Sequence, residues 1–145
     1  MFNIPETEKQ IRSRISSYKS SLNKEKKTYG SISDGGGKRY LLFCLYFVLN
    51  DLDKSRDYFN WYKNEFSDDV GEPIQKLCWS ISLHRMGQNL EAKRMLCNLM
   101  LSNLYVIPFI IGEEIKKIEM WHSSNYETPD FVEYIPKEII ENIQE

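Results

Sequence analysis

The segment from Arg39 to Phe66 recurs 37 residues further along the chain, as the segment from Lys76 to Asn103. Apolar residues return as apolar residues, and a small residue as a small one, at four pairs of positions: Tyr46 and Leu83, Ser55 and Ala92, Phe59 and Leu96, and Tyr62 and Leu99. A repeat of this length is typical of stacked helical hairpins, because a single hairpin cannot bury its own apolar face. The repeat therefore predicts an all-α fold of stacked antiparallel hairpins, an architecture that serves as a scaffold for binding.

Length and charge limit the possibilities further. With 145 residues, of which 41% are apolar, the chain is long enough for one core and too short for two. The formal net charge of −2 gives no overall attraction to nucleic acid or membrane. Residues 1–40, however, carry nine Lys or Arg against four acids, and residues 112–145 carry three against nine. The two ends, at net +5 and −6, are electrostatically distinct.

The cysteines and apolar runs predict a cytoplasmic protein. Cys44, Cys78 and Cys97 are odd in number, lie far apart and sit in apolar segments, which favours small core residues of a reducing compartment over a disulfide framework. The first residues carry charge where a secretory signal needs an apolar stretch. The longest apolar runs, 41–49 and 104–111, are far shorter than the roughly 20 residues of a membrane-spanning helix.

Turn residues and apolar spacing define the first half of the chain. A narrow apolar stripe in a charged, Ser-rich segment predicts a helix from Glu6 to about Thr28 that docks by one edge. The Gly-rich stretch 30–37 ends this helix and predicts a mobile loop. From Lys38 the residues are apolar almost all round, as in a helix packed on both sides, and a turn at 50–53 leads to the second helix of the hairpin.

The second half continues the pattern. A second hairpin begins at Glu72-Pro73 and turns at Gly87, and a third unit begins at Pro108 and ends near Ser123. Residues 131–135 are predicted to be extended, and Pro136 starts a short acidic helix suited to cap the open end of the stack. We therefore expect one domain, 1–145, composed of a basic N-terminal helix (1–29), two to three repeats (38–122) and an acidic C-terminal cap (123–145).

The block from Met86 to Ala92, continued by Leu96 and Leu99, resembles the second half of a tetratricopeptide repeat. Gly87 matches the turn between the helices, and Ala92 the small position where they touch. The likeness covers residues 38–104 well and 105–122 loosely, although the period is 37 rather than the usual 34. The run 100–112 also resembles the ending of small bacterial proteins of this divergent repeat type. The resemblance implies an α-solenoid and carries over no activity.

Catalytic and metal-binding patterns are weak in this chain. His84 and His122 lie in no spacing typical of a metal site or a nucleophile-base pair, so a structural role is the better interpretation of each. The stretch Asp34-Gly-Gly-Gly-Lys38 lacks the G-x-x-x-x-G-K-[ST] pattern of a phosphate loop. The acidic pairs 68/69 and 113/114 are interpreted as solvated charge. We therefore expect no enzyme, no cofactor and no bound metal.

The basic N-terminal segment leaves an alternative open. Lys and Arg interleaved with Tyr18 and Tyr29 between residues 9 and 27 could follow the phosphates of a nucleic acid. The charges are spread round the helix, however, which favours a solvated face docked on the acidic C-terminal third. A nucleic-acid-associated protein is therefore the second hypothesis, and nucleic acid is the less favoured partner.

The first hypothesis is a non-catalytic scaffold that binds another protein, such as a small adaptor or the immunity protein of a bacterial toxin. The aromatic residues 58, 59, 61 and 62 are more than one helix face can bury, and Trp61 lies off the inward stripe. Trp and Tyr also anchor many protein interfaces. The predicted partner-binding residues, led by Trp61, are Trp61, Lys63, Asn64, Asn60, Asp57 and Arg56.

Overall fold

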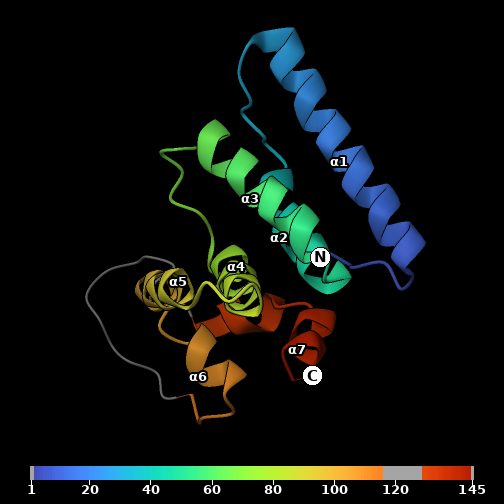
Figure 1. Ribbon diagram of the computed structural model, residues 1–145. Helices are drawn as coiled ribbons and strands as arrows, with labels where there is room; N and C mark the ends of the chain where they lie inside the picture. Colours follow the sequence, from blue (N-terminus) through green and yellow to red (C-terminus); the bar gives the residue numbers. More distant parts are fainter. Residues whose placement is uncertain (1, 116–128, 145) are drawn as a thin grey trace.

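The computed structural model of this chain describes residues 2–115 and 129–144 (Figure 1). Its helices are α1 (Glu8–Tyr29), α2 (Lys38–Leu49), α3 (Leu52–Glu65), α4 (Pro73–Arg85), α5 (Asn89–Ser102), α6 (Val106–Ile110), the 3-10 helix η2 (Pro129–Tyr134) and α7 (Lys137–Gln144). No described residue lies in a β-strand. The prediction of an all-α chain is therefore confirmed.

Helix α1 begins and ends at strong local signals. The Thr7 hydroxyl accepts a hydrogen bond from the Gln10 amide at 3.2 Å, and the Gln10 side chain accepts one from the Thr7 amide at 3.4 Å, which forms a capping box. At the other end Gly30 adopts a left-handed conformation, with φ of 75°. Ile11, with two further apolar residues of the predicted stripe, is buried where α1 packs against α2.

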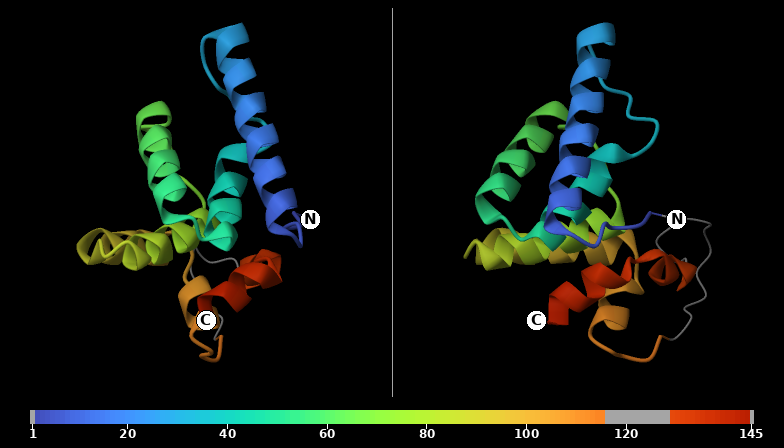
Figure 2. Two further views of the ribbon diagram at one scale, coloured as in Figure 1. Left: turned by 45° about the vertical axis from the view of Figure 1, so that its right-hand side comes forward. Right: turned by 90° about the vertical axis from the view of Figure 1, so that its right-hand side faces the viewer.

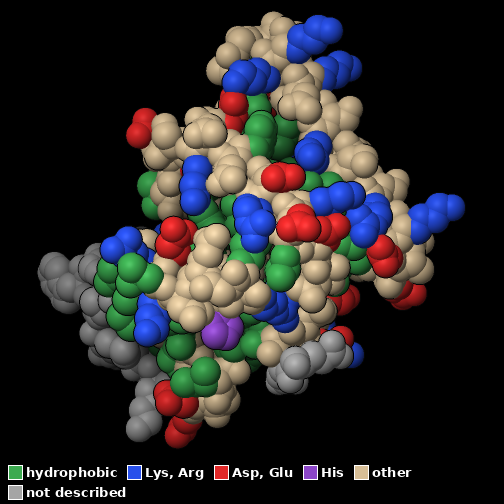
Figure 3. All heavy atoms as spheres, viewed as in Figure 1, with side chains coloured by type: hydrophobic (Ala, Val, Ile, Leu, Met, Phe, Trp, Pro, Cys, Tyr) green, Lys and Arg blue, Asp and Glu red, His purple; other side chains and the backbone are tan. Residues whose placement is uncertain are grey.

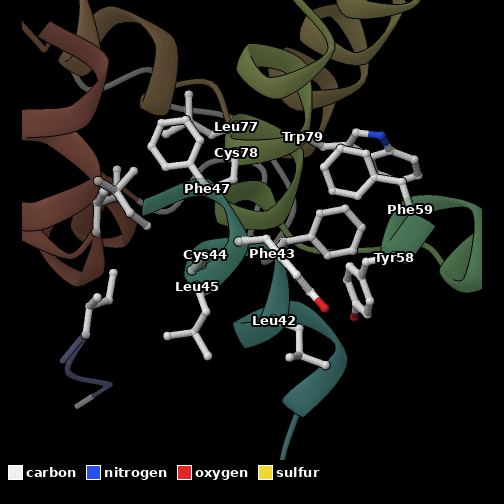
Figure 4. Packing of buried hydrophobic residues seen from close by; sticks show 14 of the residues in the cluster. Leu42, Phe43, Cys44, Leu45, Phe47, Tyr58, Phe59, Leu77, Cys78 and Trp79 are labelled. Atoms are coloured by element: carbon white, nitrogen blue, oxygen red, sulfur yellow. The ribbon is translucent and has the colours of Figure 1, made fainter. Parts of the chain in front are cut away.

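Helix α2 forms the centre of the molecule. Its six consecutive residues from Leu42 to Phe47 are all buried, because α1, α3, α4 and α7 each contact it. The ring of Phe43 lies within 5.2 Å, centroid to centroid, of four aromatic rings: Tyr58, Phe59, Tyr62 and Trp79. Figure 4 shows this aromatic cluster joining α2, α3 and α4. The nearly all-apolar sequence of this helix is thus explained by neighbours on every side.

The 37-residue period reappears in the helix bounds. Helices α3 and α5 both contain 14 residues, and their first residues, Leu52 and Asn89, are 37 apart. Three of the four repeat pairs are buried in both copies. The fourth differs, because Phe59 is buried in the aromatic cluster whereas Leu96 is 39% exposed on α5.

The two hairpins run in different directions. Helices α4 and α5 lie side by side, and they run across the direction of α1 and α3 (Figures 1 and 2). The second hairpin joins the first mainly through α4, which packs on the central helix α2.

The C-terminal third differs from its prediction. The helix expected from Pro108 to about Ser123 ends at Ile110, since Gly112 adopts a left-handed conformation, and residues 111–115 are not helical. The rest of that expected helix lies outside the described residues. Residues 131–135, predicted to be extended, belong mostly to η2. The short helix after Pro136 is confirmed as α7, which packs on α2, with the buried side chain of Ile139.

The Gly-rich stretch 30–37 is anchored at both ends. One carboxylate oxygen of Glu25 accepts hydrogen bonds from the amide and hydroxyl of Ser33, at 2.7 and 2.6 Å. The buried carboxylate of Asp34 accepts the amide hydrogens of Lys38 and Arg39, both at 2.9 Å, at the start of α2. These side chains hold the stretch at Ser33 and Asp34, and its predicted mobility stays a prediction.

Asp69 is also placed differently from its prediction as a solvated charge. Its carboxylate accepts hydrogen bonds from Arg39 Nε at 2.9 Å, the Tyr40 hydroxyl at 2.8 Å and the Tyr62 hydroxyl at 2.6 Å. Burial alone would raise the pKa of Asp69, but the hydrogen bonds from Arg39, Tyr62 and Tyr40 outweigh it and lower the pKa to about 2. This carboxylate ties the connection between α3 and α4 to the start of α2.

The replacement Asp69→Asn tests this arrangement. A carboxylate with a lowered pKa stabilises the fold above its ordinary pKa of 3.8, and this contribution is lost as the pH falls towards about 2. Allowing for solvent screening, we expect the variant to lose about 1–2 kcal/mol of unfolding free energy at neutral pH. Urea denaturation should show the difference from the wild type shrinking as the pH falls through that window.

Asp68→Asn is the matched control, because Asp68 is exposed and adjacent in sequence. It should leave the unfolding free energy nearly unchanged at every pH. A deficit of Asp69→Asn that stayed constant down to low pH would show that the carboxylate charge contributes nothing through these bonds.

Candidate interaction groove

A continuous groove runs between α1 and α3, with α2 as its floor. It consists of two adjoining hollows of about 490 and 350 Å³ that share Lys19 and Asp57. We name it the α1–α3 groove. Its lining comes from α1 (Arg12, Ile15, Ser16, Lys19, Asn23), α2 (Tyr46, Leu49) and α3 (Lys54, Asp57, Tyr58, Trp61). Figure 3 shows basic and acidic side chains interspersed over α1 and α3 on the face seen in Figure 1.

Three stacked aromatic rings form part of the groove lining. The Tyr46 and Tyr58 rings stack with centroids 5.1 Å apart, and the Tyr58 and Trp61 rings with centroids 5.6 Å apart. Trp61 also meets Phe66 edge to face at 5.8 Å, and it is half-buried against the core. Tyr46 and Tyr58 are each only 3% exposed, so the stack holds Trp61 in place, and Trp61 supplies the exposed aromatic area of the groove.

The tyrosine hydroxyls of the groove stay protonated. Burial, followed by the nearby charges of Asp51 and Asp57, raises the pKa of Tyr46 to about 12. Burial also raises the pKa of Tyr58 well above its ordinary value, and its hydroxyl donates to the Arg39 carbonyl at 2.5 Å. Neither hydroxyl is activated as a base or nucleophile at neutral pH.

Charged groups on the rim of the groove differ in whether they are paired. Arg12 binds Glu8 at 2.8 Å and approaches Asp51 at 3.7 Å. Lys19, Lys54 and Asp57 are exposed and form no ion pair with a described residue. The side chains of Lys19 and Lys54 carry two positive charges and that of Asp57 one negative charge, so these three groups have a net charge of +1. A net positive charge is complementary to a surface with acidic residues.

The predicted partner-binding residues separate into three groups. Trp61 and Asp57 line the α1–α3 groove. Lys63 lies on the other side of α3, with its Nζ 5.9 Å from the centroid of the Trp79 ring. The remaining three predicted residues, which are exposed on α3 outside both hollows of the groove, are Arg56, Asn60 and Asn64.

Sequence reasoning missed the α1 wall of the groove. Arg12, Lys19 and Asn23 line it together, as do two residues between them. A signal was present, because residues at 12, 15, 16, 19 and 23 share one face of a helix. The basic residues of this face were interpreted only as part of a nucleic-acid-binding segment or a solvated surface.

Metal and histidine chemistry find little support in the part of the chain that the structure describes. No group of three or more His, Cys, Asp or Glu side chains there is arranged to hold a metal ion. His84 is exposed and shares a hydrogen bond with Asn89 at 3.1 Å, and His122 lies outside the described residues. Among the described helices, none has the length and apolar character needed to cross a bilayer.

Comparisons with known proteins give no relative. No protein-family model, no curated protein and no solved structure matches this chain.

The half-burial of Trp61 can be tested by the replacement Trp61→Ala. Truncating a fully buried Trp costs about 3–5 kcal/mol of unfolding free energy. Because Trp61 packs on the core by one side only, we expect a loss of about 1–2 kcal/mol, with the variant still folded. Urea denaturation followed by circular dichroism gives both quantities.

Trp79→Ala is the control for this measurement, since Trp79 is 8% exposed and packs on Phe43 and Phe59. We expect it to lose the full core value of about 3–5 kcal/mol. Equal losses for the two variants would place Trp61 in the core and remove it from the groove surface.

Proposed function

We propose that this protein is a non-catalytic scaffold that holds another protein in the α1–α3 groove. The observation that carries the proposal is the stacked series Tyr46, Tyr58 and Trp61 beside the unpaired charges of Lys19 and Asp57. The ring of Trp61, held by the buried rings of Tyr58 and Tyr46, offers its contact area at a low cost in side-chain entropy. Unpaired charges at the rim select the partner and steer its approach.

The chemistry of the groove defines the partner segment. It should present an apolar or aromatic side chain to the exposed part of the Trp61 ring, and an acidic residue to Lys19 or Lys54. A partner with a basic surface would be repelled by these two lysines. We therefore propose an acidic protein surface as the ligand.

The repeat supports the same proposal. We infer that the α2–α3 and α4–α5 hairpins are a divergent, tetratricopeptide-like pair, because α3 and α5 keep the 37-residue period at both ends. Solenoids of such hairpins act as binding surfaces. A chain of this size is suited to a cytoplasmic adaptor, or to an immunity protein that neutralises a toxin. The free thiols of Cys44 and Cys78, both buried, are in keeping with a reducing compartment.

The alternative, binding of nucleic acid by α1, has weaker support. Lys26 Nζ lies 2.6 Å from the Glu65 carboxylate, and Arg12 is paired with Glu8. Arg14 donates to the carbonyl of Asn3. Cations already engaged within the protein release fewer counterions when they meet phosphates, so they contribute less to such binding.

Affinity purification with groove variants tests the proposal. The tagged wild-type protein should capture a stoichiometric protein partner from its native lysate after nuclease treatment. Trp61→Ala should weaken binding by roughly 30-fold, since truncation of an interface anchor costs about 2 kcal/mol or more. Lys19→Glu should weaken it too, most strongly at low salt, because it reverses the charge offered to an acidic partner.

Lys27→Glu is the matched control, because Lys27 is exposed on the same helix and lies outside the groove. It should bind the partner as the wild type does. Capture that disappears with nuclease would favour the nucleic-acid hypothesis. Equal weakening by the Lys19 and Lys27 variants would show that the general charge of α1, and not the groove, holds the partner.

A further inference from the structure

A hollow separate from the groove lies on the other side of α3, and we name it the α3–α5 pocket. It has a volume of about 320 Å³ and is bounded by the end of α3, the connection to α4, and the facing sides of α4 and α5. Its lining includes Lys63, Phe66, Gln75, Lys76, Trp79 and Met95. The pocket shares no residue with the α1–α3 groove.

Two buried hydrogen-bond donors of this pocket have no partner among the residues that the structure describes. Gln75 is 2% exposed, and its Oε1 accepts the Glu72 amide at 3.0 Å, but its Nε2 bonds to no described residue. The indole Nε1 of Trp79 is likewise buried and bonds to no residue in the described part of the chain. Buried donors are nearly always paired, because an unpaired one loses the bonds it would make with water. Two orphaned donors in one pocket therefore point to an acceptor supplied from outside.

Both donors belong to the same face of α4. Positions 75 and 79 are four residues apart, about one helical turn. Figure 4 shows the indole nitrogen of Trp79 on the side of the ring away from Phe43 and Tyr58. The Gln75 amide lies near the hydroxyl of Tyr62 and partly offsets the rise in its pKa that burial causes, but the two groups do not meet hydrogen-bond geometry.

The charge around the pocket is positive. Lys63 lies over the Trp79 ring, and Lys76 donates from Nζ to the Ser102 hydroxyl at 2.5 Å. Neither lysine forms an ion pair with a described residue. The one carboxylate in the lining, that of Asp69, is already neutralised by Arg39.

We propose that the α3–α5 pocket binds a carboxylate group, whose two oxygens accept hydrogen bonds from Trp79 Nε1 and Gln75 Nε2. Lys63 and Lys76 supply the opposite charge, and Phe66 and Met95 contact the carbon chain that carries the carboxylate. Both nitrogens are closed off from solvent, so binding requires the side chains around them to rearrange locally. This site goes beyond the scaffold function, since it depends on no residue of the α1–α3 groove.

The donors favour a carboxylate over phosphate. A planar group with two acceptor oxygens satisfies two donors on one helix face, and a single negative charge is balanced by two lysines. A doubly charged phosphate would also face the ionised Asp69 at the pocket wall. The carboxylate could belong to a free small acid or to an acidic side chain of a peptide.

The indole proton of Trp79 provides a direct test by nuclear magnetic resonance. The chain has three Trp residues, so Trp61→Phe and Trp121→Phe variants assign the Trp79 signal without altering the pocket. Titration of the full-length protein with glutarate should shift this signal downfield as the N–H gains an acceptor. Glutaramide, which has the same length and no charge, should shift it far less.

Variants and probes separate the possible outcomes. Lys63→Met should weaken glutarate binding about tenfold, and Lys93→Met, on the exposed side of α5, should leave it unchanged. If an acetylated Gly-Glu-Gly amide binds with a lower Kd than glutarate, the site is assigned to an acidic side chain. A lower Kd for glutarate assigns it to a free acid.

Three results would overturn the proposal. One is a Trp79 signal unmoved by glutarate and by the peptide up to roughly 10 mM, tenfold above a weak Kd of about 1 mM. The second is equal weakening by the Lys63 and Lys93 variants. The third is inorganic phosphate binding as tightly as glutarate, which would show a general attraction for anions.

Discussion

The rest of the structure depends on the ion pairs that the guanidinium of Arg39 forms with Asp34 and Asp69. Arg39 Nε binds Asp69 at 2.9 Å, its Nη1 binds Asp34 at 2.9 Å, and its carbonyl accepts the Tyr58 hydroxyl. We call these contacts the Arg39 network. Burial alone would lower the pKa of Arg39, but the hydrogen bonds of Asp69 and Asp34 raise it. Because a largely buried cation without partners is very costly, both acids have to stay in place. The network thus fixes the loop before α2, the helix α3 and the α3–α4 connection together.

The sequence predicted those parts of the fold that depend on local signals. Glu72-Pro73 and Gly87 marked the bounds of α4, because proline fits the first helical turn and glycine adopts a left-handed conformation after the last one. The 37-residue period marked α3 and α5. The same period predicted a helix through Ile111 that the structure does not show. Ile111 lies beyond the end of α6 and is 62% exposed. Three matching positions are too few to establish a helix.

Tertiary contacts were beyond the reach of sequence reasoning. Asp69 pairs with Arg39, 30 residues away, and no local pattern distinguishes it from the exposed Asp68. The α1–α3 groove has the same origin, because its wall on α1 faces α3 only once both helices have packed on α2. Trp61 could be proposed from the sequence, since its angle on α3 separates it from the inward stripe. Its neighbours across the groove could not.

Helix α3 separates two hollows with different linings, the α1–α3 groove and the α3–α5 pocket. Trp61 and Lys63 are two residues apart, about 200° round the helix, so one lines the groove and the other lies over the pocket. Between these faces, Tyr58 donates to the Arg39 carbonyl, and Tyr62 donates to a carboxylate of the Arg39 network. A partner that rotated α3 to widen the groove would have to break both bonds. The groove therefore keeps a fixed shape, and for the proposed scaffold function this lowers the entropic cost of binding.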